Sequence, residues 1–484
     1  MKTNTLHKSA LKLCAMLMAM PLLTSCKQQT QVSDAAPEAP KTTSTAPPAY
    51  PLKVSANGRY VVDQSNTPFL IVGDTPQGLI YRLNEKQADD YFADRQAHGF
   101  NTMGWIDVLC AGRDYPANTF GATPDGIRPF TGFVGGGKDW THYDLSKPNE
   151  AYFVRLDHIV ELAAKHNLFV FLDPIETAGW LSTLRTNGVA AASAYGQYLG
   201  NRYKKYLNVA WMNGNDFASW QTATDDALVL AVAKGIKSVD PDQIQTVEFN
   251  PPTGSSLDDA SWKAVISING AYIYGPTYIQ VLYNYNQTPV MPVFLMEAHY
   301  ELENVGRPPD FGTPPVLRRE EYWAMLSGGK GQFYGNMYTW SFKTGWENNI
   351  DTPGVAQVTI WKDFFTSLPW QDLVPDQDHS VVTAGYGAPG DTKQPAVSKS
   401  DYATTSKTPD GGLVVAYMPT ARTVTVNMAS LKANASAKWF DPTNGTYTSI
   451  PGQPFANNGT QKFTPPEKNR DGDSDWLLLL DASK

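Results

Sequence analysis

Cysteine is scarce in this chain, with three residues among 484, at positions 14, 26 and 110. The first two lie in an N-terminal segment that has the features of a targeting signal, so Cys110 has no partner and the sequence excludes an internal disulfide. A catalytic thiol needs a setting that lowers its pKa, and we predict instead that Cys110 is an ordinary buried side chain. The fold must therefore be held by its core.

A surplus of positive charge is also missing. The chain has 39 Lys and Arg against 47 Asp and Glu, which gives a formal net charge of −8. Binding to nucleic acid needs a basic surface, so we exclude nucleic acid as a partner. The composition, 42 % hydrophobic and 18 % charged, is typical of a globular protein that is long enough to bury a large core.

Several catalytic and metal-binding signatures are absent from the sequence. There is no GxSxG elbow of a serine hydrolase, and no HExxH motif or Cys–His cluster of a zinc site. The glycines at 135–137 lack the Lys-Ser/Thr of a phosphate loop. Asp471, Asp473 and Asp475 alternate as in calcium loops, but the final Glu is missing, and we predict a solvated turn. The sequence therefore predicts neither a metal nor a cofactor.

A long apolar run is lacking too, since Leu13–Leu23 is too short to span a bilayer as a helix. It follows a basic start and precedes Leu23-Thr24-Ser25-Cys26, which resembles the bacterial lipobox. We expect residues 1–26 to be a lipoprotein signal peptide, with Cys26 lipidated as the only membrane contact. Residues 27–50, rich in Gln, Ser, Thr, Ala and Pro, are predicted to be a disordered tether. Lys27 is compatible with an outer-membrane location, on the periplasmic face or at the cell surface.

Strand and helix patterns alternate through residues 51–371. Asn57-Gly58 between two alternating runs predicts a hairpin at the start. Helical patterns cover Asn84–His98, Pro148–His166, Asp225–Val239 and Arg318–Leu326. The apolar strand candidates are Phe69–Thr75, Asn101–Ile106, Leu168–Pro174, Val209–Asp216, Ile244–Asn250, Val265–Tyr272, Val293–Tyr300 and Gln332–Trp340.

Eight such units, with apolar rather than alternating strands, predict an α/β fold, a (β/α)8 TIM barrel. A doubly wound open sheet is the alternative, disfavoured because no glycine-rich phosphate loop follows the first strand. Residues 372–484 differ, because short runs separated by Gly, Pro and Asn turns predict a small antiparallel β-sandwich. We expect Leu477–Leu480 to be its last buried strand. We expect the sandwich to pack against the barrel, with direct sugar binding as the alternative.

The segment Pro292–Tyr300, PVFLMEAHY, ends a buried strand on Glu297, where barrel enzymes place their chemistry. Asp216 closes the fourth strand, on the facing side of the barrel mouth. Paired carboxyls are what a glycosidase needs, one protonated and one ionised. For Asp74 and Asp173, a helix cap or a turn remains the alternative. The other strand-end residues predicted to bind substrate are Asp74, Trp105, Asp107, Asp173, Asn215, Glu248, Asn250, Tyr272, His299, Tyr338 and Trp340.

Gly73-Asp74-Thr75 and the segments AHGFN (97–101), WMNGND (211–216) and PVFLME (292–297) resemble the apiosidase-like family of (β/α)8 glycoside hydrolases. WFDPTNG (439–445) and DWLL (475–478) resemble the β-sandwich that accompanies such barrels and carries a collagen-binding label. The resemblance implies Asp216 as general acid/base, Glu297 as nucleophile, and exo-acting removal of an apiose-like pentose or another sugar from pectic side chains. The family commonly has two glycines before the acid, and the second is Asn215 in this chain.

The sequence is therefore compatible with two functions of different class. The first is a retaining glycosidase, which requires carboxyls ~5–5.5 Å apart, whereas ~6.5–9.5 Å indicates inversion. The second is a carbohydrate- or protein-binding surface lipoprotein whose barrel has lost catalysis, an alternative that Asn215 supports.

Overall fold

The computed structural model describes residues 47–109, 120–217, 222–249, 253–304, 307, 310–390 and 396–483. The predicted signal peptide with Cys26, nearly all of the predicted tether, Cys110 and Asn250 lie outside these ranges. Within them, no helix has both the length and the apolar character that a membrane crossing requires.

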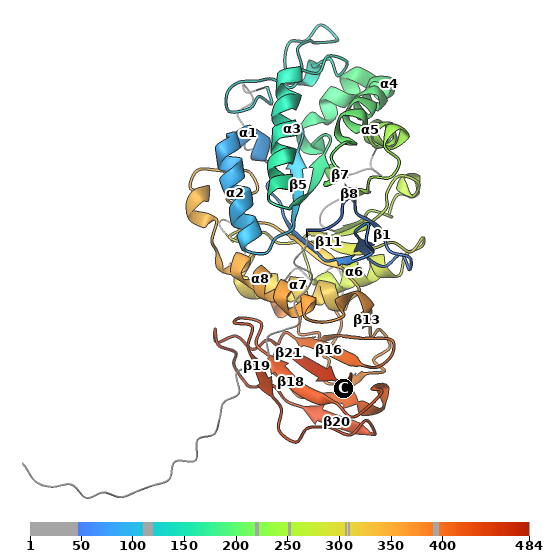
Figure 1. Ribbon diagram of the computed structural model, residues 1–484, viewed down its shortest axis with the longest axis vertical. Helices are drawn as coiled ribbons and strands as arrows, with labels where there is room; N and C mark the ends of the chain where they lie inside the picture. Colours follow the sequence, from blue (N-terminus) through green and yellow to red (C-terminus); the bar gives the residue numbers. More distant parts are fainter. Residues whose placement is uncertain are drawn as a thin grey trace, which may run out of the picture. The chain divides into compact units, whose positions relative to one another are not determined.

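The described residues contain eight parallel strands that form the predicted barrel (Figure 1). Strand β12 pairs with β4, so the last strand closes on the first. The ring is interrupted between β8 and β10, where the antiparallel strand β9 (Thr253–Ser255) pairs with β10. The Ser267 backbone N–H donates to the Gln245 carbonyl at 2.8 Å across this gap. The eight strands are β4 (Ile71–Asp74), β5 (Thr102–Asp107), β6 (Phe169–Asp173), β7 (Val209–Phe217), β8 (Gln245–Phe249), β10 (Asn269–Ile273), β11 (Val293–Glu297) and β12 (Gly331–Tyr334).

Helices cover the outside of the barrel strands. Asn84 caps α2 in a capping box with Gln87. Asn149 caps α3, so Pro148 lies just before the first turn of the helix. Proline occupies the first turn of α7 and α8. The helices are α1 (Leu79–Arg82), α2 (Glu85–Ala97), α3 (Glu150–Lys165), α4 (Thr177–Tyr203), α5 (Ala223–Val239), α6 (Thr277–Tyr285), α7 (Pro314–Leu326) and α8 (Pro353–Thr366).

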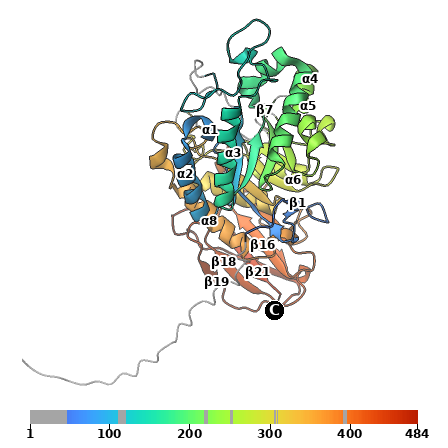
Figure 2. The same ribbon diagram turned by 45° about the horizontal axis from the view of Figure 1, so that its top comes forward.

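Helices α4 and α5 lie side by side, as Figures 1 and 2 both show. Glycine allows this close contact. A Cβ added at Gly196 would lie 2.1 Å from the Val232 carbonyl oxygen, and one at Gly235 would lie 2.2 Å from that of Ser193. The two backbones therefore approach to a distance that no larger residue permits, which fixes one helix against the other.

Large apolar side chains fill the barrel interior. Trp105, Phe171, Phe294 and Phe333 belong to one buried cluster. A Cβ added at Gly104 would lie 2.5 Å from the Phe333 ring, so glycine makes room for that ring. The predicted hairpin is present as β1 (Lys53–Val54) and β2 (Val61–Val62), followed by β3 (Pro68–Phe69). Its apolar residues join the same cluster at the amino end of the barrel.

In the described part of the C-terminal region, the strands form two antiparallel sheets, as predicted. Strand β21 pairs with both β16 and β18. Leu478 and Leu480 belong to the sandwich core, whereas Leu477 and Leu479 belong to the main core, which explains the unbroken apolar run. The strands are β13 (Val374–Pro375), β14 (Val382–Ala384), β15 (Thr404–Lys407), β16 (Leu413–Met418), β17 (Val424–Asn427), β18 (Ser436–Phe440), β19 (Tyr447–Ser449), β20 (Thr460–Phe463) and β21 (Trp476–Asp481).

Arg318 of α7 joins the barrel to the sandwich. Its buried guanidinium donates to both carboxylate oxygens of Asp475 at 3.0 Å and to Asp473 at 2.6 Å. The prediction of a solvated turn at 471–475 is therefore wrong for Asp475, which is buried and paired. The Arg318 guanidinium, which comes from α7, neutralises the Asp475 carboxylate, where the sequence predicts solvation by water.

Candidate active site

A cavity of about 330 Å³ lies where the barrel strands end. Five predicted site residues are on its wall, namely Asp107, Asn215, Asp216, Glu297 and Trp340. Because the carboxyl ends of parallel strands meet at one edge, residues far apart in sequence converge there. The other lining residues are Gln77, Glu176, Ala178, Tyr274, Tyr300, Glu303, Arg307 and Met337.

Asp216 lies in an unusual backbone conformation, with φ of +50°. The pairing of β7 with β8 is irregular between Asn213 and Phe217, and such bulges re-aim side chains at active sites. The Asp216 backbone N–H donates to Glu248 Oε2 at 2.9 Å, and Tyr272 donates its hydroxyl to Asp216 Oδ1 at 2.8 Å. A left-handed conformation of a residue other than glycine costs energy and persists only when its surroundings hold it. Here Glu248 and Tyr272 hold both the backbone and the carboxyl of Asp216.

Glu297 ends β11 and lies on the cavity wall. Tyr274 donates its hydroxyl to Glu297 Oε1 at 3.0 Å, which favours the ionised form. Burial, with a further contribution from the charge of Asp216, nevertheless raises the pKa of Glu297 to about 8. Glu297 can therefore hold or release a proton near neutral pH.

Glu248 lies near the end of β8, where it accepts the Asp216 backbone N–H and lies close to Glu297. It is buried, and burial followed by the charges of Glu297 and Asp216 raises its pKa well above the ordinary value. Three carboxyls this close cannot all be ionised, so the cluster retains protons at neutral pH. The arrangement can supply both an acid and a base.

A second acidic group comes from the ends of β5 and β6 and the segment after β6. Asp107 and Glu176 line the wall, and Asp173 is buried behind them. Burial and then the charge of Glu176 raise the pKa of Asp173 well above its ordinary value. Asp173 Oδ1 accepts the Ile175 backbone N–H at 3.1 Å, which is the turn role that the sequence had left open.

The cavity wall as a whole is acidic. Its described residues include the carboxylates Asp107, Glu176, Asp216, Glu297 and Glu303, and a single cation, Arg307. Arg307 is paired with Glu303 at 3.2 Å. Such a wall repels an anion, whereas its carboxylates accept hydrogen bonds from hydroxyl groups.

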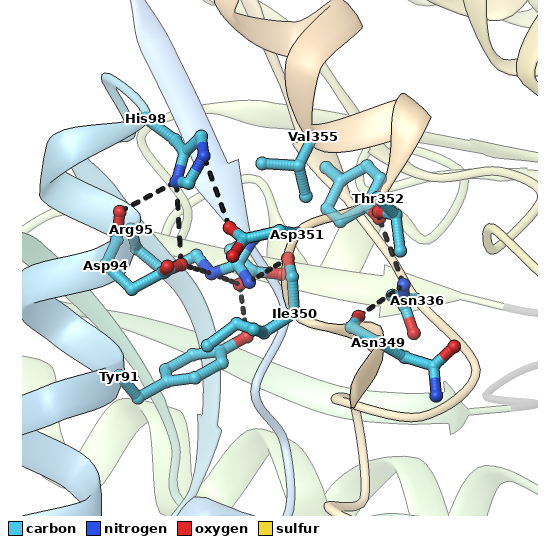
Figure 3. Close-up of polar contacts among 12 residues, drawn as sticks. Tyr91, Asp94, Arg95, His98, Asn336, Asn349, Ile350, Asp351, Thr352 and Val355 are labelled. Carbon is cyan, nitrogen blue, oxygen red and sulfur yellow. Dashed lines mark hydrogen bonds and ion pairs between the residues drawn. The ribbon is translucent and has the colours of Figure 1, made fainter. Parts of the chain in front are cut away.

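Other predicted substrate-binding residues lie away from the cavity wall. Asp74 is buried, accepts the Thr75 backbone N–H at 2.8 Å, and contacts Tyr91 and Arg95 of α2. Figure 3 shows Arg95 beside Tyr91, with its guanidinium bonded to the Ile350 carbonyl at 2.6 Å. Asp74 therefore joins its strand to α2, and Arg95 joins α2 to the segment before α8.

Trp105 has no exposed surface and lies in the barrel interior. Tyr272 and Glu248 contact Asp216 without lining the cavity. His299 is buried and paired with Glu320, and its ring packs edge-on against Tyr274 with centroids 5.0 Å apart. Burial opposes a charge on His299, but the carboxylate of Glu320 outweighs it and raises the His299 pKa. Tyr338 lies outside the wall, with the Lys343 ammonium 4.4 Å from its ring centroid.

Sequence reasoning missed several wall residues, including Gln77, Tyr274 and Tyr300. Gln77 donates to the Tyr300 hydroxyl at 3.0 Å, so these two residues support each other. One signal was available for Tyr274, because it lies two residues after Tyr272 and so follows the same face of the chain. Nothing in the local sequence marks Gln77 or Tyr300 as wall residues.

Among the described residues, Asp94, His98 and Asp351 could together hold a metal ion. His98 Nε2 lies 3.3 Å from Asp351 Oδ1, and its Nδ1 lies 3.6 Å from Asp94 Oδ1 (Figure 3). The Arg95 guanidinium already neutralises Asp94 at 3.2 Å, and none of the three residues lines the cavity. The group links α2 to the segment before α8.

Comparisons with known proteins agree with this geometry. The family profile described as "Apiosidase-like, catalytic domain" matches residues 55–372, and that described as "Putative collagen-binding domain of a collagenase" matches residues 392–481. The crystal structure of a glycoside hydrolase family 5 protein from Bacteroides vulgatus is similar, with a TM-score of 0.73, 21% identity, and coverage of 89% of this chain and 93% of that chain. A second solved structure, described as a glycoside hydrolase, has a TM-score of 0.72 and 23% identity, and the match covers 90% of this chain and 98% of that one. No curated protein matches the chain in sequence.

Proposed function

Because the chain belongs to the apiosidase-like family and is a glycoside hydrolase, we propose that it is a retaining, exo-acting enzyme that removes an apiose-like pentose from pectic oligosaccharides. One observation carries the proposal: Asp216 and Glu297 lie on one cavity wall, and the buried Glu248 lies close to both. Contact with a common carboxyl supports a short separation, which retention requires.

In the proposed reaction, Asp216 protonates the glycosidic oxygen while Glu297 attacks the anomeric carbon. The bond from that carbon to the leaving oxygen breaks, and a bond to the Glu297 carboxylate forms. Asp216 then removes a proton from water, and the water oxygen displaces Glu297 from the sugar. Tyr272 and Tyr274 orient the two carboxyls through their hydroxyl groups.

The size and charge of the cavity support a single neutral sugar as the group that is removed. A space of about 330 Å³ suits a terminal residue better than a long internal segment of a chain. The acidic wall disfavours a uronate at this position. The identity of the sugar as an apiose-like pentose rests on the family.

The decisive test is sugar release from a pectin-derived oligosaccharide pool, measured by mass spectrometry, with Glu297→Gln as the matched control. We expect the wild type alone to release one pentose, while the variant stays folded by circular dichroism. Release of a different sugar would retain the mechanism and discard the pentose, and internal cleavage would contradict exo action. The anomer formed first, observed by proton NMR, should match that of the substrate, and the opposite anomer would establish inversion.

A binding protein without catalysis is the second candidate, and Asn215 is the observation that favours it. In this chain the Asn215 backbone accepts from and donates to the Thr177 hydroxyl, at 2.5 and 3.1 Å, which positions the residue before Asp216. This candidate predicts that oligosaccharides bind without forming a product. Turnover that Glu297→Gln abolishes would eliminate it.

We also propose that Cys26 anchors the protein to the bacterial envelope through lipid, with residues 27–50 as a spacer. The lipobox-like sequence supports this location. Labelling of cells with an alkyne fatty acid should modify the wild type and not Cys26→Ala. Equal labelling of both proteins would contradict the anchor.

A further inference from the structure

A second cavity, of about 230 Å³, adjoins the first. Ala178 and Asp216 are on the walls of both cavities. We infer that this second cavity is the leaving-group site, which holds the sugar residue on the far side of the bond that is cleaved. The inference rests on the proposed function, because it takes Asp216 as the acid. The cavity is lined by Thr177, Ala178, Leu181, Arg185, Asp216, Phe217, Thr222 and Asp225.

The position of the acid decides which part of the substrate lies in which cavity. The proton must reach the glycosidic oxygen, so this oxygen lies beside the Asp216 carboxyl. Glu297 lines the first cavity and not the second. As the nucleophile, it must face the anomeric carbon of the terminal sugar that the enzyme removes. That sugar therefore occupies the first cavity. The remainder of the substrate, attached through the oxygen, extends past Asp216 into the second.

The walls of the second cavity match the two kinds of surface on a sugar. Leu181 and Phe217 offer apolar surface for the C–H face of a ring. The Arg185 guanidinium donates two hydrogen bonds, both 2.7 Å long, to the Asp225 carboxylate. This pair presents hydrogen-bonding groups without net charge, because each partner neutralises the other. The ligand class is therefore a hydroxylated sugar residue.

The site is built before a ligand arrives. Leu181 and Arg185 come from the first part of α4, before its break at Gly188, and the Arg185–Asp225 ion pair joins this part to the start of α5. Thr222 also donates its hydroxyl to Asp225 and helps to orient its carboxylate. Fixed donors and acceptors bind with a smaller entropic cost than mobile ones.

The test uses the two products of the wild-type digestion as inhibitors. After purification, the released monosaccharide and the shortened oligosaccharide are each titrated against the wild type and its variants. Leu181→Trp fills the second cavity, and Arg185→Ala removes a surface donor if the larger substitution impairs folding. Val189→Trp is the matched control, because it adds the same bulk to α4 at a half-exposed position that lines neither cavity.

We expect Leu181→Trp and Arg185→Ala to raise the inhibition constant of the oligosaccharide about tenfold and to leave that of the monosaccharide within about twofold. Val189→Trp should change neither constant. If both variants leave the oligosaccharide constant unchanged, or shift both constants equally, the leaving-group site is overturned and the glycosidase stands. If the wild type releases no sugar at all, the proposed function fails first, and this inference fails with it.

Discussion

Protonation of single residues decides what the cavity can do. Burial and the charge of Asp216 raise the pKa of Glu297 to about 8, and Tyr274 opposes the shift by donating to the carboxylate. A nucleophile must be ionised, so the proposed role of Glu297 predicts a particular pH dependence. The opposite role, proton donation, predicts the reverse.

We expect the limb on which kcat/KM rises with pH to lie near pH 8, because this parameter reports the ionisation of the free enzyme and Glu297 must lose its proton to attack. Tyr274→Phe removes a hydrogen bond to the ionised form, so it should move this limb to higher pH by about one unit. The measurement is a pH–rate profile of both proteins. If Tyr274→Phe instead displaces the limb on which kcat/KM falls with pH, the acid role belongs to Glu297.

Glu248 is predicted to act as a positioning residue. Glu248→Ala leaves the Asp216 backbone N–H without its acceptor, at a cost of roughly 1–3 kcal/mol. The displaced carboxyl should lower kcat on the order of a hundredfold. Glu248→Gln keeps a similar shape with both a donor and an acceptor, and should retain most of the activity and stability. Equal loss in both variants would mean that the Glu248 proton itself takes part in the reaction.

At the scale of elements, the backbone conformation at the end of β7 positions Asp216 in the active site. Gly214 has φ of +76°, and Asp216 two residues later is also left-handed. Helix and strand patterns predict where β7 and β11 lie but not this turn, because it depends on contacts with β8. The sequence also overextends three strands, predicting Gln332–Trp340, Val265–Tyr272 and Val293–Tyr300 where the structure has Gly331–Tyr334, Asn269–Ile273 and Val293–Glu297. Apolar and aromatic residues in the segments next to a strand have the same composition as the strand itself. The sequence alone therefore does not show where the strand begins or ends.

Gly214→Ala should therefore impair both stability and activity. The new Cβ would lie 3.0 Å from Phe217 Cβ and 3.1 Å from the Glu248 carbonyl oxygen, in a conformation that alanine disfavours by roughly 1–2 kcal/mol. Gly126→Ala is the control, because Gly126 has φ of +83° and open space around it. Urea denaturation should show the larger loss for Gly214→Ala. Similar losses in both variants would indicate that the close contacts at Gly214 contribute nothing.

At the scale of the whole molecule, buried polar groups join the parts of the chain. Arg318 binds Asp475 of the C-terminal region, and Lys330 donates its ammonium protons to the carbonyls of Trp370 and Leu373 at 3.0 and 2.8 Å. Arg318 lies in α7 and Lys330 lies just before β12, and their partners come from the end of the barrel region and from the C-terminal region. Burial, opposed in part by the charge of Asp372, lowers the pKa of Lys330 to about 7.

This shift predicts a pH-dependent stability. Between pH 7 and the ordinary lysine pKa of 10.5, the unfolded chain holds a proton at Lys330 that the folded protein lacks. Stability should therefore rise with pH in this window, by at most about 1.4 kcal/mol per pH unit from this group. Lys330→Met removes the group, so the difference in unfolding free energy between the variant and the wild type should change with pH. A constant difference from pH 7 to 10 would contradict the lowered pKa.

The sequence by itself determined the barrel, the sandwich and the positions of Asp216 and Glu297, because buried strands and their polar ends are local patterns. Tertiary structure decided which of these residues share a cavity. Asp74, Asp173 and Trp105 occupy strand positions like that of Asp107 and are as buried as it is, yet of these four only Asp107 is on the cavity wall. It also decided the protonation of Glu297 and Glu248 and the pairing of Asp475, because charge and desolvation depend on groups that are distant along the chain and adjacent only after folding.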